Sequence, residues 1–212
     1  MKIVSPTISP QLPEGKVTQL TTEASLEKLH FNGLDIVAMQ AKNLTLEEVV
    51  LEKVIAVQAK LEKLQLSDVL AKGCDWSGAD CADGSVIRAI FSNCRGAGWD
   101  LNKAVLKDVV FKDCKLDMAN FRFAKLTQVQ FVDCSFVEAD FQAATLTHVE
   151  FQHCIVDKTE FGQCTIKDVD LRSSQLLEVR GWQSLKGVTI DGAQLVSVAP
   201  QLAAALGLKT EE

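Results

Sequence analysis

The residues with the most obvious chemistry in this sequence are cysteines. Five of the seven are separated by twenty residues each: Cys74, Cys94, Cys114, Cys134 and Cys154. Thiolates can form disulfides, bind zinc or act as nucleophiles. In one row at the spacing of about 4.8 Å between neighbouring strands, adjacent thiols would be within disulfide reach, but a straight row cannot supply four tetrahedral ligands. Cysteine is also small and apolar, so we interpret the row as structural; a redox sensor or enzyme using these thiols is the alternative.

The other residues capable of catalysis are scattered. His30, His148 and His153 lie far from any fixed Ser-His-Asp or Cys-His arrangement, and no phosphate-binding glycine loop is present. We therefore predict a protein that is not an enzyme and that has no catalytic, metal-binding or cofactor-binding residues.

The cysteine interval points to the elements that position these residues. Phe-Lys-Asp-Cys begins at Phe111, and Phe-Val-Asp-Cys begins twenty residues later at Phe131. Within this interval lies a period of five, because every fifth residue from Leu26 to Leu176 is apolar except Gly96. Internal repeats of this kind determine the whole fold.

A second apolar series lies two residues before the first and is mostly small in the second half. It is interrupted only at Gly84, Thr159 and Ser174. A period of five fits neither the 3.6 residues of a helix turn nor the two of a strand. It predicts a chain that turns a corner every five residues, so that four corners close a square and coils stack at strand spacing.

At this point the sequence resembles the pentapeptide-repeat proteins, whose pattern is Ala-(Asp/Asn)-(Leu/Phe)-x-x. Ala79-Asp80-Cys81, Ala119-Asn120-Phe121 and Ala139-Asp140-Phe141 carry the pattern. The resemblance covers residues 26–176 and implies an all-β fold, a right-handed quadrilateral β-helix, and a bacterial source. The first coils depart from it, because leucine or methionine fills the small position at Leu29, Leu34, Met39, Leu44 and Leu64.

Residues 44–66 also allow a helix, because Val50, Val54, Val57, Leu61 and Leu64 have helical spacing. We prefer the β-helix, since both five-residue series pass through this stretch in register. Within it, the coil period predicts two internal stacks. One contains Phe91, Phe111, Phe131 and Phe151, and the opposite one contains Leu101, Phe121, Phe141 and Phe161.

The ends of the coil need caps, because stacked strands expose hydrogen-bonding edges. We expect residues 1–25 to form an extended N-terminal cap and residues 177–212 a partial coil with a short α-helical C-terminal cap. Asp191 resembles an N-cap, Pro200 the first turn of a second helix, and Gly207 its end. The tail has an apolar side that caps the coil or forms a homodimer contact through Leu202, Leu206 and Leu208.

Two outward columns are candidate contact surfaces. The first is an acidic stripe of Asp80, Asp100, Asn120, Asp140 and Glu160. Some pentapeptide-repeat proteins imitate DNA and bind DNA gyrase, but Asp or Asn in this position also fits a role in bonding the turning backbone. The second is an apolar stripe of Val50, Leu70, Ile90 and Val110, covered either by the N-terminal segment, which we prefer, or by another protein.

Composition narrows the function further. A net charge of -6 argues against direct binding to nucleic acid, and no signal peptide or membrane-length apolar run is present. We expect a cytoplasmic protein, a monomer or a homodimer through the C-terminal cap, that presents rigid faces to an unidentified protein partner. The alternative is a DNA-mimicking inhibitor or protector of DNA gyrase.

Overall fold

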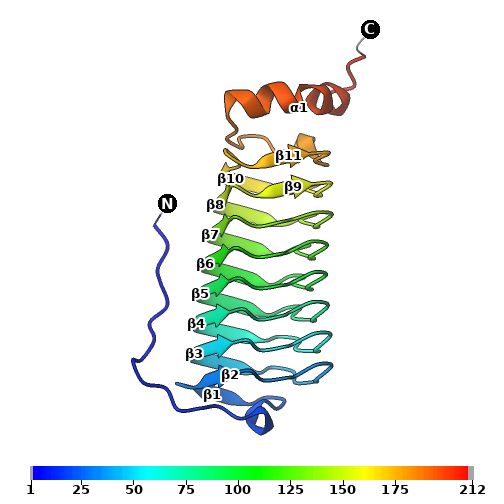
Figure 1. The fold of residues 1–212 in the computed structure, drawn as a ribbon. Coiled ribbons are helices and arrows are strands. Elements are labelled where there is room, and N and C mark those ends of the chain that lie inside the picture. Colours follow the sequence, from blue (N-terminus) through cyan, green and yellow to red (C-terminus); the bar gives the residue numbers. More distant parts are fainter. Residues whose placement is uncertain (1, 210–212) are drawn as a thin grey trace.

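The chain forms a right-handed four-sided β-helix closed by one C-terminal helix (Figure 1). The structure is a computed structural model, which describes residues 2–209. Its main sheet is parallel and runs in the order β1-β3-β4-β5-β6-β7-β8-β10, with β2 also paired to β3. Each strand pairs with the strand twenty residues later, as Leu46 does with Leu66. The twenty-residue coil predicted from the sequence is therefore confirmed.

The full strands of this sheet are eight residues long. They are β3 (Thr45–Glu52), β4 (Gln65–Lys72), β5 (Ser85–Ser92), β6 (Val105–Lys112), β7 (Lys125–Val132) and β8 (Thr145–Gln152). Shorter strands complete it at both ends, namely β1 (Ser25–Glu27), β2 (His30–Asn32) and β10 (Thr165–Asp170). A separate pair is formed by β9 (Ile155–Asp157) and β11 (Gln175–Leu177).

Each long strand bends around a corner at its fourth residue. In β6 this residue is Asp108, whose φ is 56°, and in β4 it is Asp68, whose φ is 52°. Such left-handed residues break the extended backbone, so the halves of the strand lie on adjacent sides of the square. The corner side chains point outward and form columns along the rod.

The interior is filled by the two apolar series. All residues of the central series are buried except Leu26 and Ile166, which are partly exposed near the two ends. The rings of Phe91, Phe111, Phe131 and Phe151 stack with centroids 4.9–5.1 Å apart. Phe121, Phe141 and Phe161 form the second stack, at 4.6 and 5.2 Å. Both predicted stacks are confirmed.

The stretch that also had helical spacing is β-helical. Residues 44–66 contain β3 and the start of β4, and Leu44 and Leu64 occupy the small inward position although they are large. Ala41 and Ala56 in the neighbouring central series compensate for that volume. The compensation of side-chain volume is not complete, because an apolar cavity of about 20 Å³ remains among the leucines and Phe31.

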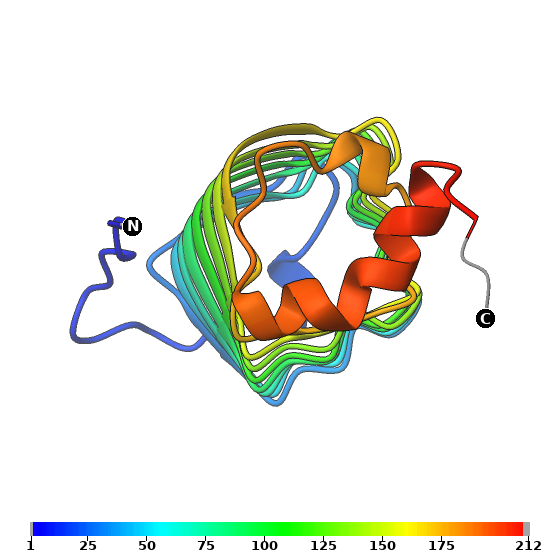
Figure 2. The same cartoon turned by 90° about the horizontal axis from the view of Figure 1, so that it is seen from above.

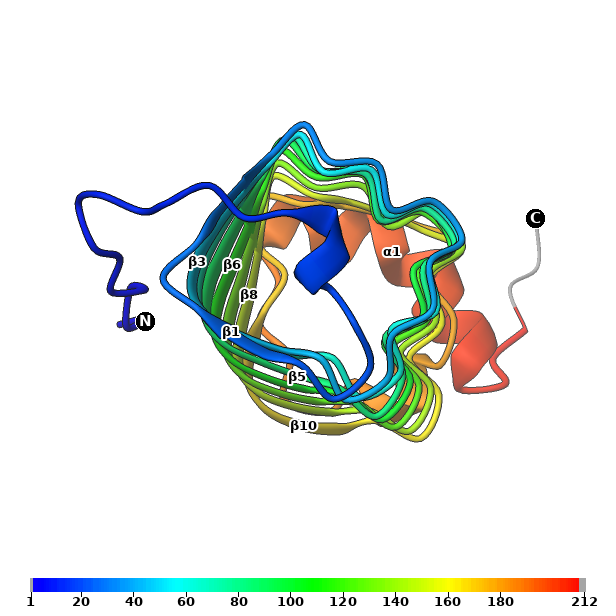
Figure 3. The ribbon, with the colours of Figure 1, turned by 90° about the horizontal axis from the view of Figure 1, so that it is seen from below.

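The lower end is covered by residues 13–20. The Gly15 amide donates to the His30 carbonyl at 2.8 Å, so the segment pairs with β2 before it crosses the opening. A Cβ at Gly15 would lie 2.2 Å from the Phe31 ring, which explains the glycine. The 3-10 turn η1 (Val17–Gln19) follows and brings Leu20 into the core (Figure 3).

The upper end is covered by α1 (Gly192–Ala205), which lies across the last coil after the 3-10 turn η2 (Trp182–Ser184) (Figure 2). Asp191 is the N-cap, accepting from the Gln194 amide at 2.9 Å. Gly207 ends the helix with φ of 72°, and its amide donates to the Ala204 carbonyl. The next amide, that of Leu208, donates to the Ala203 carbonyl, which completes a Schellman motif.

The prediction that a second helix begins at Pro200 is wrong, because Pro200 lies inside α1. A proline in this place removes the bond to the carbonyl of the residue four positions earlier, Val196, and its ring crowds that carbonyl. Val196 is exposed, so water can hydrogen-bond that carbonyl and the helix continues.

Two glutamines of α1 make hydrogen bonds to the last coil that a further coil above it would otherwise make. The Gln194 amide group donates to the carbonyls of Leu171 and Ser174, both at 2.7 Å. The side-chain oxygen of Gln201, Oε1, accepts from the Val179 amide and from the Trp182 ring N–H. The helix thus satisfies backbone groups at the open edge, which favours termination over edge-to-edge association.

Candidate protein-interaction surface

The cysteine row is buried and bonded to the backbone. Each thiol lies near the carbonyl of a core residue 23 positions earlier, as Cys114 does to Phe91 at 3.6 Å and Cys134 to Phe111 at 3.5 Å. All seven cysteines are free, and only Cys164 is partly exposed. Hydrogen bonding to Cys134 together with burial raises the pKa of Cys114 to about 12. Cys154 is the exception in the row, because hydrogen bonding to Cys134 lowers the pKa of its thiol. It is buried as the others are, so burial and the backbone bonds place the row for packing.

The histidines lie apart on the outside of the coil. His148 pairs with Asp168 at 3.3 Å and His153 with Asp133 at 3.8 Å, while His30 lies 3.6 Å from Glu52. Within residues 2–209 no three His, Cys, Asp or Glu side chains are grouped closely enough to hold a metal ion.

The residues of the acidic stripe line one side of the rod and bond their own turns. Asp80, Asp100 and Asp140 each accept the backbone amide two residues later, at 2.7–3.1 Å. Asn120 and Glu160 accept in the same way. One oxygen of each side chain is therefore bonded to the backbone. The five side chains are half-buried.

Basic side chains divide the acidic stripe. Arg122 Nη1 lies 3.0 Å from Asp140 Oδ2, and the Asn120 amide group donates to Asp100 at 2.9 Å. The column continues to Lys60 below Asp80 and to Arg180 above Glu160. The stripe is therefore a mixed polar column rather than a continuous anionic face.

The apolar stripe lies on the second half of β3 to β6, and the N-terminal segment runs along this face. Val50, Leu70, Ile90 and Val110 are all half-buried. In Figure 1 the segment descends beside the strands from the level of the upper coils to the bottom of the rod. We call residues 2–12 the strap.

The strap is held by the corner column next to the apolar stripe. The Val4 amide donates to Asp108 Oδ1 at 3.0 Å, and the Thr7 amide donates to Asp68 Oδ1 at 2.9 Å. The Ser9 hydroxyl donates to Glu48, and Gln128 donates to the Lys2 carbonyl at 2.9 Å. These contacts join residues that are up to 126 positions apart in the sequence.

Two of the corner carboxylates are almost completely buried. Asp68 is 8% exposed and Asp108 is 5% exposed. Arg88 bonds Asp68 through two nitrogens, one of them at 2.9 Å, and this guanidinium holds the pKa of Asp68 below its ordinary value. The strap therefore lies on a column of buried charge that has one basic member.

The repeat that builds these columns also identifies the family. A family model described as a pentapeptide repeat region matches residues 84–161 and again residues 124–195, which together exceed half of the chain. The chain belongs to the pentapeptide-repeat family.

Two solved pentapeptide-repeat structures are similar to this pentapeptide-repeat protein at low identity. Full-length QnrB1, a plasmid-mediated fluoroquinolone resistance protein, is 17% identical with a TM-score of 0.44; the match covers 86% of this chain and 91% of QnrB1. HetL, from the cyanobacterium Nostoc sp. strain PCC 7120 and involved in heterocyst differentiation regulation, is 13% identical with a TM-score of 0.43, over 81% and 91%. No curated protein matches the sequence. These similarities are too low to transfer a role.

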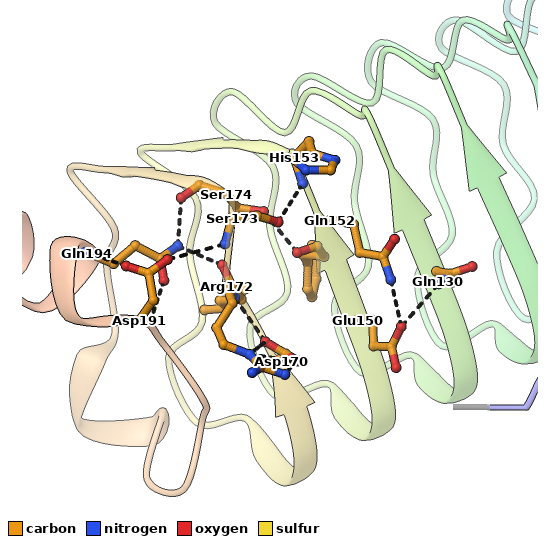
Figure 4. A network of polar contacts seen from close by, with 12 residues as sticks. Gln130, Glu150, Gln152, His153, Asp170, Arg172, Ser173, Ser174, Asp191 and Gln194 are labelled. Carbon is orange, nitrogen blue, oxygen red and sulfur yellow. Dashed lines mark hydrogen bonds and ion pairs between the residues drawn. The ribbon is translucent and has the colours of Figure 1, made fainter.

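A polar network joins the sheet to the upper cap of this pentapeptide-repeat protein (Figure 4). Arg172 bonds Asp170 at 2.6 Å, and Glu150 accepts from Gln130 at 3.0 Å and Gln152 at 2.9 Å. A shallow polar hollow of about 420 Å³ lies beside it. Of the charged residues that line it, Arg172 pairs with Asp170 and Asp191 is the N-cap of α1, so we assign it to the junction between coil and cap.

The outer side of α1 is neutral and partly apolar. Leu206 is 74% exposed and Leu208 is 62% exposed, whereas Leu202 packs against the core. No charged residue occurs between positions 192 and 208. Of the three leucines expected to form a homodimer contact, two are thus placed to do so and Leu202 belongs to the cap. No helix in residues 2–209 is long and apolar enough to cross a membrane.

The sequence reasoning missed two features of this surface and core. The first is the set of hydrogen bonds that hold the strap, because they have no periodic signal, although the corner position of Asp68 and Asp108 follows from the coil period. The second is the ring partner of the buried Trp99. Its ring stacks on Trp76 with centroids 5.1 Å apart and 9° between planes.

Proposed function

We propose that this protein acts without catalysis, by presenting rigid faces of its coil to a macromolecular partner. The observation that carries the proposal is the use of its reactive groups inside the fold. The cysteine row bonds core carbonyls, and the acidic stripe bonds the corners of the coil. What remains for recognition is the outer surface.

The shape of the molecule supports the same proposal. The core is filled by stacked rings, and the apolar cavity among the leucines and Phe31, about 20 Å³, holds no substrate-sized group. The larger hollows at Glu150 and at Val50 are open, shallow depressions of the surface. Small-molecule sites usually have hundreds of cubic ångströms with a few converging polar groups. Free thiols throughout the described chain also suit the reducing cytoplasm, where we place the protein.

A crosslinking experiment on a single coil tests this proposal. One residue is chosen on each of the four successive sides of one coil: Asn102, which is partly exposed, and Lys107, Lys112 and Lys115, which are exposed. A photo-crosslinking amino acid at each position, in cells that produce the full chain, should capture a partner from one side or from two adjacent sides. Equal capture from all four sides, or none from any, would contradict a dedicated binding face.

The second candidate function is a DNA mimic that inhibits or protects DNA gyrase. Its support is the row of carboxylates at coil spacing, Asp80, Asp100, Asp140 and Glu160. Arg122 and the turn bonds weaken the anionic field of that row. A supercoiling assay decides the matter: no inhibition and no protection of gyrase at micromolar protein would rule the mimic out.

We also propose the upper cap as a homodimer contact. The exposed, uncharged side of α1 and the turn after it support this contact, where Leu195, Leu206 and Leu208 are exposed. Sedimentation velocity should show a dimer that Leu206→Lys with Leu208→Lys converts to a monomer. Leu177→Lys, at another exposed leucine, is the matched control.

A further inference from the structure

The strap lies on the sheet as an extended peptide ligand would. Val4 and Thr7 donate to Asp108 and Asp68, which are two coils apart. Three residues of extended chain span about 10 Å, and two coils span about the same distance. The spacing of the strap amides therefore matches the spacing of the carboxylates beneath them.

The carboxylates beneath the strap need that partner. Asp108 is 5% exposed, and within the described residues the Val4 amide is its hydrogen-bond donor. A carboxylate that a covering chain shields from water needs a donor from that chain, and a backbone N–H from a chain that runs along the rod supplies it here. Arg88 compensates part of the charge between the two acids through its bonds to Asp68.

The strap leaves part of the face open. Near its lower end a hollow of about 510 Å³ lies between the sheet and the strap, lined by Ile8, Pro10 and Leu12 on one side and by Val50 and His30 on the other. Val50 begins the apolar stripe. An apolar side chain from another molecule can therefore enter here while the strap is still bound.

The strap is held less firmly than the coil. No backbone–backbone hydrogen bond joins residues 3–12 to the sheet, whereas every coil is bonded to its neighbours by such ladders. Pro6 and Pro10 lack the amides that strand pairing would need. Between residues 3 and 12 the strap carries no charge, so no ion pair holds it. Segments with few such bonds open at lower free energy than the core.

We propose that the face under the strap is a groove for an extended, uncharged peptide. The strap occupies it in the free protein, and a partner segment takes it by displacing the strap. The incoming segment places one amide on Asp108 and another, three residues later, on Asp68. An apolar side chain of the segment packs on Val50, in place of the strap residues that form the other wall of the hollow. The groove proposal rests on the proposed function, and it specifies which face of the coil binds and what kind of partner segment it binds.

Displacement can be forced in the full chain by one substitution. Ser9 donates to Glu48, so Ser9→Asp places two carboxylates against each other and should release the strap. Ser5→Asp is the matched control, because Ser5 is exposed on the same strap and makes no side-chain hydrogen bond within the described residues. Hydrogen exchange at Val4 and Thr7 should be at least tenfold faster in Ser9→Asp than in Ser5→Asp.

Binding is then measured with a fluorescein-labelled synthetic peptide of residues 2–12. We expect it to bind the Ser9→Asp protein at least tenfold more tightly than the wild-type or Ser5→Asp protein, where the tethered strap competes at high effective concentration. A peptide with N-methyl groups on the Val4 and Thr7 amides should bind with at least tenfold lower affinity, because it cannot donate to Asp108 and Asp68.

Three results would overturn the proposal. The strap could stay protected in Ser9→Asp and also in Ile3→Ser with Ile8→Ser, which would make it a fixed part of the fold. The released protein could fail to bind the peptide, or it could bind the N-methylated peptide equally well. Because these measurements use the isolated protein, they can fail while face-specific crosslinking succeeds, which separates this proposal from the general one.

Discussion

The hydroxyl of Ser174 donates a hydrogen bond of 2.9 Å to the carbonyl of Phe151, in the position that the thiol of Cys154 takes toward Phe131 one coil below. Thr159 repeats the bond to the Phe136 carbonyl, at 2.7 Å, in the same inward series. The two polar residues that interrupt this apolar series are thus donors to the coil beneath. Cysteine suits the row because it is small and because it can donate.

This equivalence predicts the effect of changing a cysteine. Cys114→Ser should keep the bond to the Phe91 carbonyl and lower the free energy of unfolding by less than about 1 kcal/mol. Cys114→Leu should cost about 1–3 kcal/mol, because it overpacks a filled core and removes the donor. Urea melts of the two variants measure the difference, and an equal loss in both would mean that the bond is irrelevant.

Burial also predicts slow thiol chemistry. Desolvation raises the pKa of Cys81 to about 12 and that of Cys164 to about 11, so neither is a thiolate near neutral pH. With a thiol reagent at pH 8, the native protein should label slowly and first at the partly exposed Cys164. The unfolded protein should label at all seven cysteines. Rapid native labelling of Cys94, Cys114 or Cys134 would show that the row is accessible.

The ring stack predicts a large effect at its centre. Phe131 is fully buried between Phe111 and Phe151, so Phe131→Ala should lower the free energy of unfolding by about 3–5 kcal/mol. Phe123→Ala is the control. Because Phe123 is an exposed corner residue, this substitution should change the free energy of unfolding by less than about 0.5 kcal/mol. A loss below about 1 kcal/mol for Phe131→Ala, by chemical denaturation, would contradict the packing.

The bond between Asp68 and Arg88 predicts a pH dependence. The folded-state pKa of Asp68 is lowered, so its contribution is complete above the unfolded-state pKa of about 3.9 and is lost as the pH falls through the folded value. Asp68→Asn should therefore destabilise the protein at pH 7, by about 1 kcal/mol because solvent screens part of the pair, and have little effect near pH 2. Asp113→Asn, at an exposed corner, is the control. A pH-independent difference would contradict this role.

The repeating part of the fold could be predicted because each core position is specified many times. The step of five places Phe111 and Phe131 in one stack and Cys114 and Cys134 in one row. The register also decided between helix and strand at residues 44–66, where local spacing alone was ambiguous. There the alternation of large and small residues, as at Leu44 and Ala41, carried the information.

The parts that could not be predicted depend on single contacts. The bond from Val4 to Asp108 joins residues 104 positions apart and, like the bond from Thr7 to Asp68, belongs to the strap and not to the repeat. Likewise, Pro200 has the local features of a helix start, and only the exposure of Val196 shows why α1 passes through it. The surface was the less predictable part, because side chains that point outward are not constrained by the coil period.

The pairing of each strand with the strand twenty residues later has a consequence for how the gene can change. Duplicating a twenty-residue unit adds one level and lengthens the rod by about 4.8 Å, while both caps keep their own contacts. An insertion that is not a multiple of five would turn core residues outward in every later coil. Natural variation in the length of such a rod is therefore expected to occur in whole levels.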